Sequence, residues 1–321
     1  MRDLIRILTS LALLLVAVFS PCSQAQDYPN RSVRIVCPYP PGGFIDTLSR
    51  VTAQRLSENL GQQVLVDSRP GASGVIGGNV VAKAPPDGYT LLISVPSLFT
   101  IVPHLLEQMP FRTEDLAPIT LLVSNALLLV THPSVPANSV GELIALGRSK
   151  PGSLSVASAG SGTVLHLAAE QFQVGAGVRL THVPYGAAQA LVDLTAGRVQ
   201  LMFHNFEAVW PYVKAGRLRA IAVTSRERVS LAPNIPTLHE TGLPDYEVTN
   251  WYGVFAHAAT PRKIVDLLNR ELIRAIPEIR AKFPDTGATW GGSTPEEVTA
   301  AIRRESAQWG ALIRKLRLKS Q

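Results

Sequence analysis

The 321-residue sequence predicts an α/β fold with two lobes, and three observations support this prediction. Apolar, β-branched runs alternate with segments of helical spacing along nearly the whole chain, a pattern typical of largely parallel sheets covered by helices. Two glycine-rich turns, at residues 41–43 and 158–162, each join a strand to a helix in separate parts of the chain. The chain is also long enough to form two hydrophobic cores. If the two units face one another, both turns open onto one cleft.

Residues 1–25 have the pattern of a cleaved export signal. Two arginines precede an apolar run at residues 7–19, and Ser23 and Ala25 place small residues at a cleavage site. This run of about 13 residues is shorter than the roughly 20 that a membrane-spanning helix needs. A retained membrane anchor is one alternative. Cys22 raises a second, a lipoprotein, although the proline before it is unfavourable for lipidation, so we expect cleavage near Ala25.

Charge and cysteine content narrow the possible functions. The formal net charge is +6, and only 17% of the residues are charged. The basic residues are scattered except at residues 314–319, where they suit the C-terminal end of a helix dipole rather than a nucleic-acid-binding patch. A mild positive charge helps to attract anions. Removal of the signal leaves Cys37 without a disulfide partner, and we expect it to be a small buried apolar residue.

The turn at residues 41–43 has the composition of an anion-binding loop. The strand at residues 33–37 runs into three prolines, which fix the turn, and then into Gly42 and Gly43, whose N–H groups no side chain covers. A helical pattern opens at Asp46. Unpaired N–H groups beside the positive end of a helix dipole suit a carboxylate or another anion.

The other expected elements follow from periodicity and from turn residues. Further strands are expected at residues 63–67, 89–95, 154–157, 199–203, 218–224 and 250–255, with two separate apolar segments at 119–123 and 126–131. Helices are expected at residues 47–60, from 74 to 84, at 163–174 and at 295–316. The strand at residues 250–255 is expected close to a chain crossover.

Motifs for catalysis or cofactor binding are missing from the sequence. It contains no His-Glu-x-x-His pair, no Cys-x-x-Cys, no Gly-x-Ser-x-Gly and no phosphate loop. The glycines at 160 and 162 lack the third glycine and the acidic residue of a dinucleotide fingerprint, and the histidines lack metal-ligand spacing. We therefore expect a binding protein with no catalytic residues, no metal and no cofactor. A cofactor-dependent periplasmic enzyme is the alternative from another class.

Several short motifs occur in an order that matches a known family. In chain order they are Tyr28-Pro29, Pro41-Gly42-Gly43 with Asp46, Arg69-Pro70-Gly71-Ala72, Ala84-Pro85-Pro86-Asp87-Gly88-Tyr89, the turn at 158–162, His182-Val183-Pro184-Tyr185, Ala222-Val223-Thr224-Ser225 with Arg228, Pro236-Thr237, Trp251-Tyr252-Gly253 and Thr260-Pro261. Each motif alone is weak, but together they are specific and cover nearly the whole chain after the signal. The sequence closely resembles the substrate-binding receptors of tripartite tricarboxylate transporters, also called Bug receptors.

The resemblance implies a periplasmic binding protein of the type II, Venus-flytrap kind, with a ligand cleft between two lobes. Lobe 1 would contain residues 27–125 and 250–321, and lobe 2 would contain residues 126–249. Such receptors deliver small carboxylates to a two-component membrane permease that an ion gradient drives. The implied partners of a monomeric periplasmic receptor are thus an organic acid and the permease, with no nucleic acid. Presentation of the ligand to a sensor kinase is an alternative for the same pocket.

The expected ligand-binding residues come from strand ends and from the two glycine-rich turns. They are Tyr39, Pro41, Gly42, Gly43, Asp46, Ser94, Ser97, Ser158, Ser161, Gly162, Thr163, Tyr185, His204 and Asn205. The resemblance implies that main-chain groups and ordered waters hold the carboxylate, without a salt bridge. Asp46 could instead be the N-cap of its helix, and one hydroxyl among residues 158–163 should cap the helix that follows. Tyr185 could cover a ligand or only pack.

Two departures from the family pattern bear on the ligand. Gly186 follows Tyr185 directly, where a Lys or Arg usually precedes the glycine, so the loop is one residue shorter and a cation is missing. His204 replaces a common Asp and should partly restore positive character. A third departure, at residues 256–261, concerns a hinge or surface turn.

Four other aromatic side chains have structural explanations. We expect His166 and His182 to be hydrogen-bonded histidines of the protein body. We expect Trp251 and Tyr252 to pack in the core or at a hinge.

Overall fold

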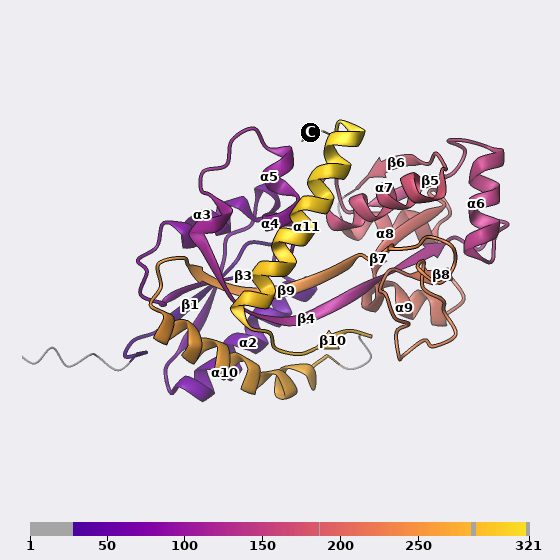
Figure 1. The fold of residues 1–321 in the computed structure, drawn as a ribbon. Coiled ribbons are helices and arrows are strands. Elements are labelled where there is room, and N and C mark those ends of the chain that lie inside the picture. The colour runs from indigo at the N-terminus through magenta and orange to yellow at the C-terminus, as the bar shows by residue number, and fades with distance from the viewer. Residues whose placement is uncertain (1–27, 186, 284–286, 319–321) are drawn as a thin grey trace, which may run out of the picture.

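The computed structural model describes residues 28–185, 187–283 and 287–318, which form two lobes around a ten-stranded sheet (Figure 1). The predicted export signal and Gly186 lie outside the described residues. Among the described residues, no helix is both long enough and apolar enough to cross a membrane.

The first lobe is built from both ends of the described chain. It begins with β1 (Val33–Cys37), α2 (Phe44–Leu60), β2 (Val64–Ser68), the 3-10 turn η1 (Ala72–Gly74), α3 (Val75–Ala82), β3 (Thr90–Ser94), α4 (Ser97–Thr100), α5 (Val102–Leu105) and η2 (Thr113–Asp115). The chain returns to this lobe with β9 (Thr249–His257), α10 (Arg262–Arg280), β10 (Thr289–Trp290) and α11 (Pro295–Leu316).

The second lobe holds the middle of the chain. After β4 (Leu116–Thr131) come α6 (Val140–Ser149), β5 (Ser155–Ser158), α7 (Val164–Ala176), β6 (Thr181–Pro184), α8 (Ala187–Thr195), β7 (Leu201–Asn205), α9 (Phe206–Lys214) and β8 (Arg219–Val223). The alternation of strands and helices that the sequence predicts is therefore confirmed.

The sheet is mixed, with the order β2-β1-β3-β9-β4-β7-β5-β6, while β8 and β10 also pair with β4. The outer strands are parallel, since β1 pairs in parallel with β2 and β3, and β5 does so with β6 and β7. The pairs β3–β9, β9–β4 and β4–β7 are antiparallel. The expectation of largely parallel sheets is thus correct for the outer strands and wrong at the centre, where β4 and β9 connect the lobes in opposite directions.

Strand β4 is one element of 16 residues rather than two separate segments. The polar pair Ser124 and Asn125 interrupts its apolar run, which led us to expect a break. The backbone remains extended there because β9 pairs along it, up to Ala126 opposite Thr249. From Leu127 onward β4 pairs with β7. This change of partner supports lobe boundaries at 125/126 and 249/250, which we retain as a proposal.

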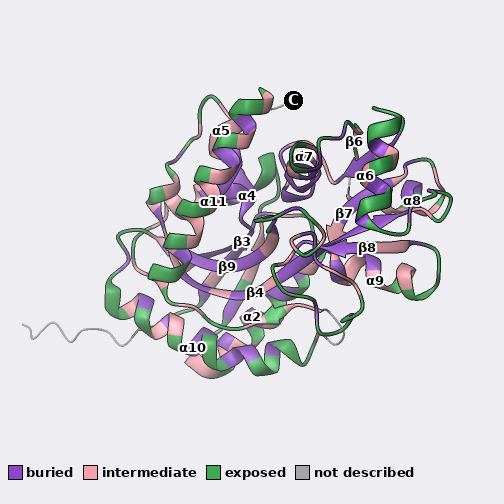
Figure 2. Cartoon of the chain, turned by 45° about the vertical axis from the view of Figure 1, so that its right-hand side comes forward, coloured by how far each residue is buried: buried purple, intermediate pink, exposed green. Residues whose placement is uncertain are grey.

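The sheet of the first lobe lies between two helical layers (Figure 2). On one face, α2 and α10 bury apolar residues such as Leu48 and Leu268, both fully inaccessible, against β1, β3 and β9. On the other face, α3, α4 and the start of α11 pack around Trp251 and Phe255. Cys37 is fully buried as a free cysteine, as predicted. Burial on both faces explains why β1 and β3 are almost continuously apolar.

Helix α11 spans both lobes (Figure 1). Val298 near its start belongs to the core of the first lobe, whereas Trp309 and Ile313 belong to the core of the second. The helix begins after Thr294, which forms a reciprocal capping box with Glu297 at 3.2 and 2.8 Å. Its bounds are those that the sequence predicts. One helix therefore packs against the cores of both lobes and crosses the strands that connect them.

Candidate functional site

The β1–α2 turn is open and presents backbone donors. Gly42 and Gly43 are exposed, and an added Cβ at either would meet nothing within 4 Å. Gly42 has φ +89°, which a glycine adopts without strain. Within the described residues, the N–H groups of Gly43 and Phe44 form no hydrogen bond. These donors lie at the first turn of the 17-residue helix α2, where an anion is favoured.

Asp46 fixes this turn instead of capping the helix at the expected position. Helix α2 begins at Phe44 with Gly43 as its N-cap, so the interpretation of Asp46 as N-cap is wrong. Its carboxylate reaches back to accept the Gly42 N–H at 3.1 Å and also pairs with Arg50 at 3.1 Å. The Arg50 guanidinium, and to a smaller extent the Gly42 N–H, hold the pKa of Asp46 below its usual value. The N–H of Gly42 and the Asp46 carboxylate are therefore already used inside the turn.

Three further predicted residues gather at the ends of β1 and β3. The hydroxyl of Tyr39 lies 3.5 Å from the carbonyl oxygen of Ser73 and next to the hydroxyls of Ser94 and Ser97. Ser94 is fully buried, and its hydroxyl has no hydrogen-bond partner of normal geometry among the described residues. Ser97 is 8% exposed. This group connects the β1–α2 turn to the turn after β2, which holds Ser73.

The turn from Ser158 to Thr163 connects β5 to α7, a helix of 13 residues. Thr163 is the N-cap, since its hydroxyl accepts the His166 N–H at 3.3 Å, as expected for one hydroxyl of this set. Ser158 is fully buried, and its hydroxyl is 2.7 Å from Nε2 of His182. The hydroxyl of Ser161 and the N–H groups of Ser161 and Thr163 form no hydrogen bond to another described residue. Ser161 thus provides the available side-chain donor of this turn.

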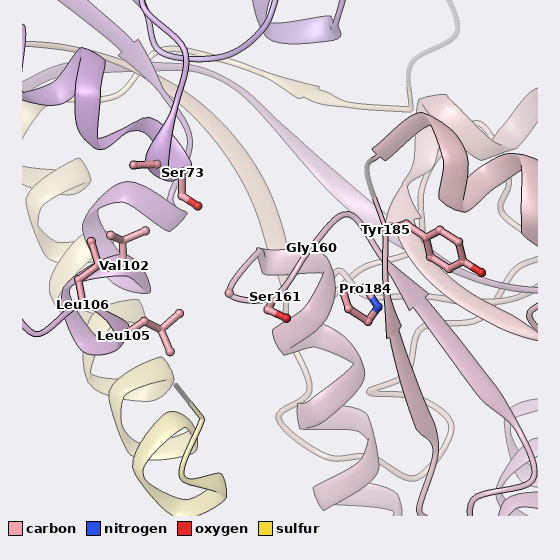
Figure 3. Close-up of a pocket in the computed structure, with 10 residues that line it drawn as sticks. Ser73, Val102, Leu105, Leu106, Gly160, Ser161, Pro184 and Tyr185 are labelled. Carbon is pink, nitrogen blue, oxygen red and sulfur yellow. The ribbon is translucent and has the colours of Figure 1, made fainter. Parts of the chain in front are cut away.

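A cavity of about 540 Å³ separates this turn from the first lobe (Figure 3). It is lined by Ala72, Ser73, Val102, Leu105, Leu106, Gly160, Ser161, Gly162, Pro184 and Tyr185. None of these side chains is charged. In the close-up, Ser73 and Leu105 lie on one side of the gap and Ser161 on the other. Two uncharged turns from different lobes therefore face each other, but the turn of the first lobe is the one that holds Ala72 and Ser73. The expected turn at residues 41–43 does not line this cavity.

Tyr185 lines the cavity, but its ring points away from Leu105 and Ser73 (Figure 3). Desolvation is the larger cause of the raised pKa of the Tyr185 hydroxyl, and a hydrogen bond to Asp193 is the second cause. The hydroxyl therefore interacts within its own lobe. Of the two explanations given for Tyr185, packing is the one that this geometry favours. The shortened loop after it includes Gly186, which lies outside the described residues.

His204 and Asn205 lie at the end of β7, beside the crossover strands. The expectation that His204 restores positive charge is wrong, because burial lowers its pKa to about 4 and leaves the ring neutral near pH 7. Its Nδ1 has no hydrogen-bond partner in the described chain. Asn205 donates to the Tyr252 hydroxyl at 3.2 Å and accepts from Asn250 at 3.2 Å. Asn205 therefore ties the second lobe to β9, in agreement with a hinge or core role for Tyr252.

Sequence reasoning missed several walls of the cavity. Ser161, Gly162 and Tyr185 are the predicted site residues that line it. Ala72 and Ser73 were identifiable, because the glycine-rich turn at 69–74 follows β2, which pairs in parallel with β1. Parallel neighbours end at the same edge of a sheet, so their turns are adjacent. Leu105, on the short helix α5, could not be identified in this way, because an apolar side chain in a sequence is normally interpreted as part of the core.

Metal binding finds no support in the part of the chain that the structure describes, which holds no group of three or more His, Cys, Asp or Glu side chains placed around a common point. The site as described offers main-chain N–H groups, hydroxyls and an apolar wall. Such a surface suits an anion with a carbon skeleton.

Comparisons with known proteins agree with this geometry. The sequence profile described as "Tripartite tricarboxylate transporter family receptor" matches residues 48–318. The chain is 36% identical over 295 residues to Protein BugT of Bordetella pertussis, covering 90% of each chain. This chain belongs to the tripartite tricarboxylate transporter receptor family. The resemblance stated from the motifs is therefore confirmed, and the family is one of periplasmic solute-binding receptors rather than enzymes.

Solved structures of the receptor family share the fold. The protein described as "R. palustris Rpa4515 with adipate" has a TM-score of 0.80 and 35% identity, covering 90% of this chain and 98% of its own. "MatC (Rpa3494) from Rhodopseudomonas palustris with bound malate" has a TM-score of 0.77 and 28% identity, covering 89% and 100%. The periplasmic binding protein BugD has a TM-score of 0.77 and 31% identity, covering 92% and 100%. The two-lobed, type II-like fold expected from the sequence is thus confirmed.

Proposed function

We propose that this chain is a periplasmic receptor that binds a small organic carboxylate between its lobes and delivers it to a tripartite tricarboxylate-type permease. The observation that carries the proposal is the uncharged cavity of about 540 Å³, lined by turns of both lobes. The N–H groups of Ser161 and Thr163 are unpaired among the described residues, at the positive end of α7. Several backbone donors at a helix N-terminus can hold a carboxylate without a cationic side chain.

The walls of the cavity narrow the ligand class. Val102, Leu105 and Leu106 present an apolar surface from α5 and its end, opposite the polar turn at residues 160–162. An acid with an aliphatic chain would place its carboxylate on the polar turn and its carbon atoms on this wall. Relatives of known structure hold adipate and malate, both dicarboxylates. We therefore propose an aliphatic dicarboxylate as the preferred ligand, with adipate favoured over the hydroxylated malate.

Isothermal titration calorimetry of the purified chain tests ligand binding directly. The panel contains adipate, malate, shorter and longer dicarboxylates, monocarboxylates and one aromatic acid. Adipamide is the matched control, because it keeps the carbon skeleton and removes both charges. We expect one-to-one binding of a dicarboxylate, at least 100-fold weaker binding of adipamide, and recovery of the ligand unchanged after incubation. A folded protein that binds no acid of the panel would refute the proposal.

Export and delivery need separate experiments. We expect protein isolated from the periplasm to begin after Ala25, and a sequence starting at Met1 would refute export with cleavage. We also expect uptake of the radiolabelled ligand to require both the receptor gene and a permease of this family. Unchanged uptake after deletion of the receptor gene would refute delivery while leaving binding intact.

A further inference from the structure

Two histidines lie against the turn that faces the cavity. His166 in the first turn of α7 and His182 on β6 stack with ring centroids 3.9 Å apart and an angle of 20° between their planes. His166 is 5% exposed. Each ring contacts a different part of the turn from Ser158 to Thr163. The pair therefore lies between the helix, the sheet and the proposed anion-binding donors.

His166 holds the end of the turn through one hydrogen bond. The N–H of Gly162 donates to its Nδ1 at 3.2 Å. An amide N–H can only donate, so Nδ1 must be the unprotonated, accepting nitrogen. The ring proton of a neutral His166 therefore resides on Nε2, which lies 3.5 Å from Oε1 of Glu170. Gly162 has φ +77°, and this hydrogen bond fixes the direction in which the Gly162 N–H points.

His182 holds the beginning of the same turn. Its Nε2 lies 2.7 Å from the hydroxyl oxygen of Ser158. That oxygen also accepts the N–H of Gly160 at 3.2 Å and lies 3.1 Å from the Gly160 carbonyl oxygen. Burial, and then the neighbouring His166, lower the pKa of His182 to about 4, while Glu170 opposes the shift. His182 is therefore neutral near pH 7.

We propose that the stacked pair of His166 and His182 positions the turn from Ser158 to Thr163 for anion binding, through the acceptor that His166 offers to Gly162 and the contact of His182 with Ser158. This inference rests on the proposed carboxylate-binding function. The hydrogen bond from Gly162 leaves the N–H groups of Ser161 and Thr163 free for the ligand. Loss of the acceptor at position 166 would leave the buried Gly162 N–H without its partner, which disfavours the present shape of the turn.

Variants at His166 test the proposal by calorimetry at pH 8.0, with adipate or with the tightest ligand of the panel. His166→Asn keeps an oxygen acceptor for the Gly162 N–H. His166→Leu removes the acceptor.

We expect His166→Asn to bind within threefold of the native chain at pH 8.0, and His166→Leu to bind at least tenfold more weakly. Native affinity in His166→Leu, or an equal loss in His166→Asn and His166→Leu, would overturn the proposal. If His166→Leu does not fold, the tautomer of His166 and the exchange protection of the Gly162 amide decide.

A readout without ligand separates this inference from the proposed function. Imidazole ¹⁵N shifts should show the Nε2–H tautomer of His166 at pH 7. The Gly162 amide should be protected from hydrogen exchange in the native chain and in His166→Asn, and should lose that protection in His166→Leu. If no acid binds at pH 8.0, the proposed function fails, and these two measurements alone decide whether the pair positions the turn. The opposite tautomer, or an unprotected Gly162 amide in the native chain, would overturn it.

Discussion

Gly162 of the second lobe and Leu105 of the first lobe face each other directly across the cleft. A Cβ atom added at Gly162 would lie 2.5 Å from Cδ1 of Leu105, closer than van der Waals contact permits. Gly162 also has φ +77°, a region that L-residues rarely adopt. The lobes therefore approach each other here as closely as a residue without a side chain allows.

Replacement of Gly162 by Ala should weaken ligand binding by at least tenfold. The new methyl group clashes with Leu105, and a non-glycine residue at this φ costs about 1–2 kcal/mol. Calorimetry with the preferred dicarboxylate measures the loss. The double variant Gly162→Ala/Leu105→Ala removes the clash and retains the backbone strain, so it should recover part of the affinity. Native affinity in the single variant would contradict the close approach of the lobes.

Loss of the Thr163 hydroxyl should destabilise the protein by about 1 kcal/mol, the usual cost of removing a helix N-cap. This hydroxyl accepts the His166 N–H at 3.3 Å and donates to the Gly160 carbonyl at 2.8 Å. Urea unfolding of Thr163→Ala measures the change. Thr163→Ser keeps the hydroxyl and should remain within 0.5 kcal/mol, about the limit expected for a mild substitution. Equal losses in both variants would show that the methyl group matters rather than the cap.

The contribution of Glu207 to stability should decrease as pH rises from 5 to 8. Asn125 on β4 donates to Oε1 of Glu207 at 3.0 Å, but Oε2 has no partner among the described residues. Burial raises the pKa of this carboxyl from 4.5 to about 7. Between these values the folded protein holds a proton that the unfolded chain has lost, so its stability falls as pH rises through the folded pKa. At pH 8 the folded protein contains a poorly solvated carboxylate.

Glu207→Gln removes this titration and retains the hydrogen bond from Asn125. It should be more stable than the native chain at pH 8 by about 1–3 kcal/mol and nearly equal at pH 5. Urea unfolding at both pH values measures the difference. Half-buried Glu305, whose pKa desolvation raises to about 7, should give a second contribution of the same sign. Glu107→Gln, at an exposed carboxylate, is the control. If the unfolding free energy of Glu207→Gln changed with pH as steeply as that of the native chain, the assignment of this titration to Glu207 would be refuted.

Phe172 and Val174 on α7 provide a matched test of the core of the second lobe. Phe172 is 1% exposed and packs against Phe203, whereas Val174 is 38% exposed. Phe172→Ala should cost about 3–5 kcal/mol of unfolding free energy, and Val174→Ala less than about 0.5. Thermal or urea unfolding measures both. Similar losses would mean that the two side chains do not differ in burial as described.

The sequence by itself determined the local features of this protein. The prolines and glycines after β1, the small residues after β5, and the capping sequence at Thr294 act over a few residues, so they are readable without a fold. The same holds for the apolar runs of β1 and β3 and for the burial of Cys37. The order of the motifs also identified the family, because each motif reflects a turn or helix start that the fold reuses.

Only the tertiary structure decided which of these features meet. The continuity of β4 through Ser124 and Asn125 depends on pairing with β9, which is far away in sequence. The neutral state of His204 depends on desolvation by its neighbours, and the wall at Leu105 depends on how the lobes are placed. The contact of Gly162 with His166 required knowledge of the helix start, and the stacking on His182 required the position of β6. Local propensity is encoded in neighbouring residues, whereas burial, charge state and cleft geometry arise from segments that touch only after the chain has folded.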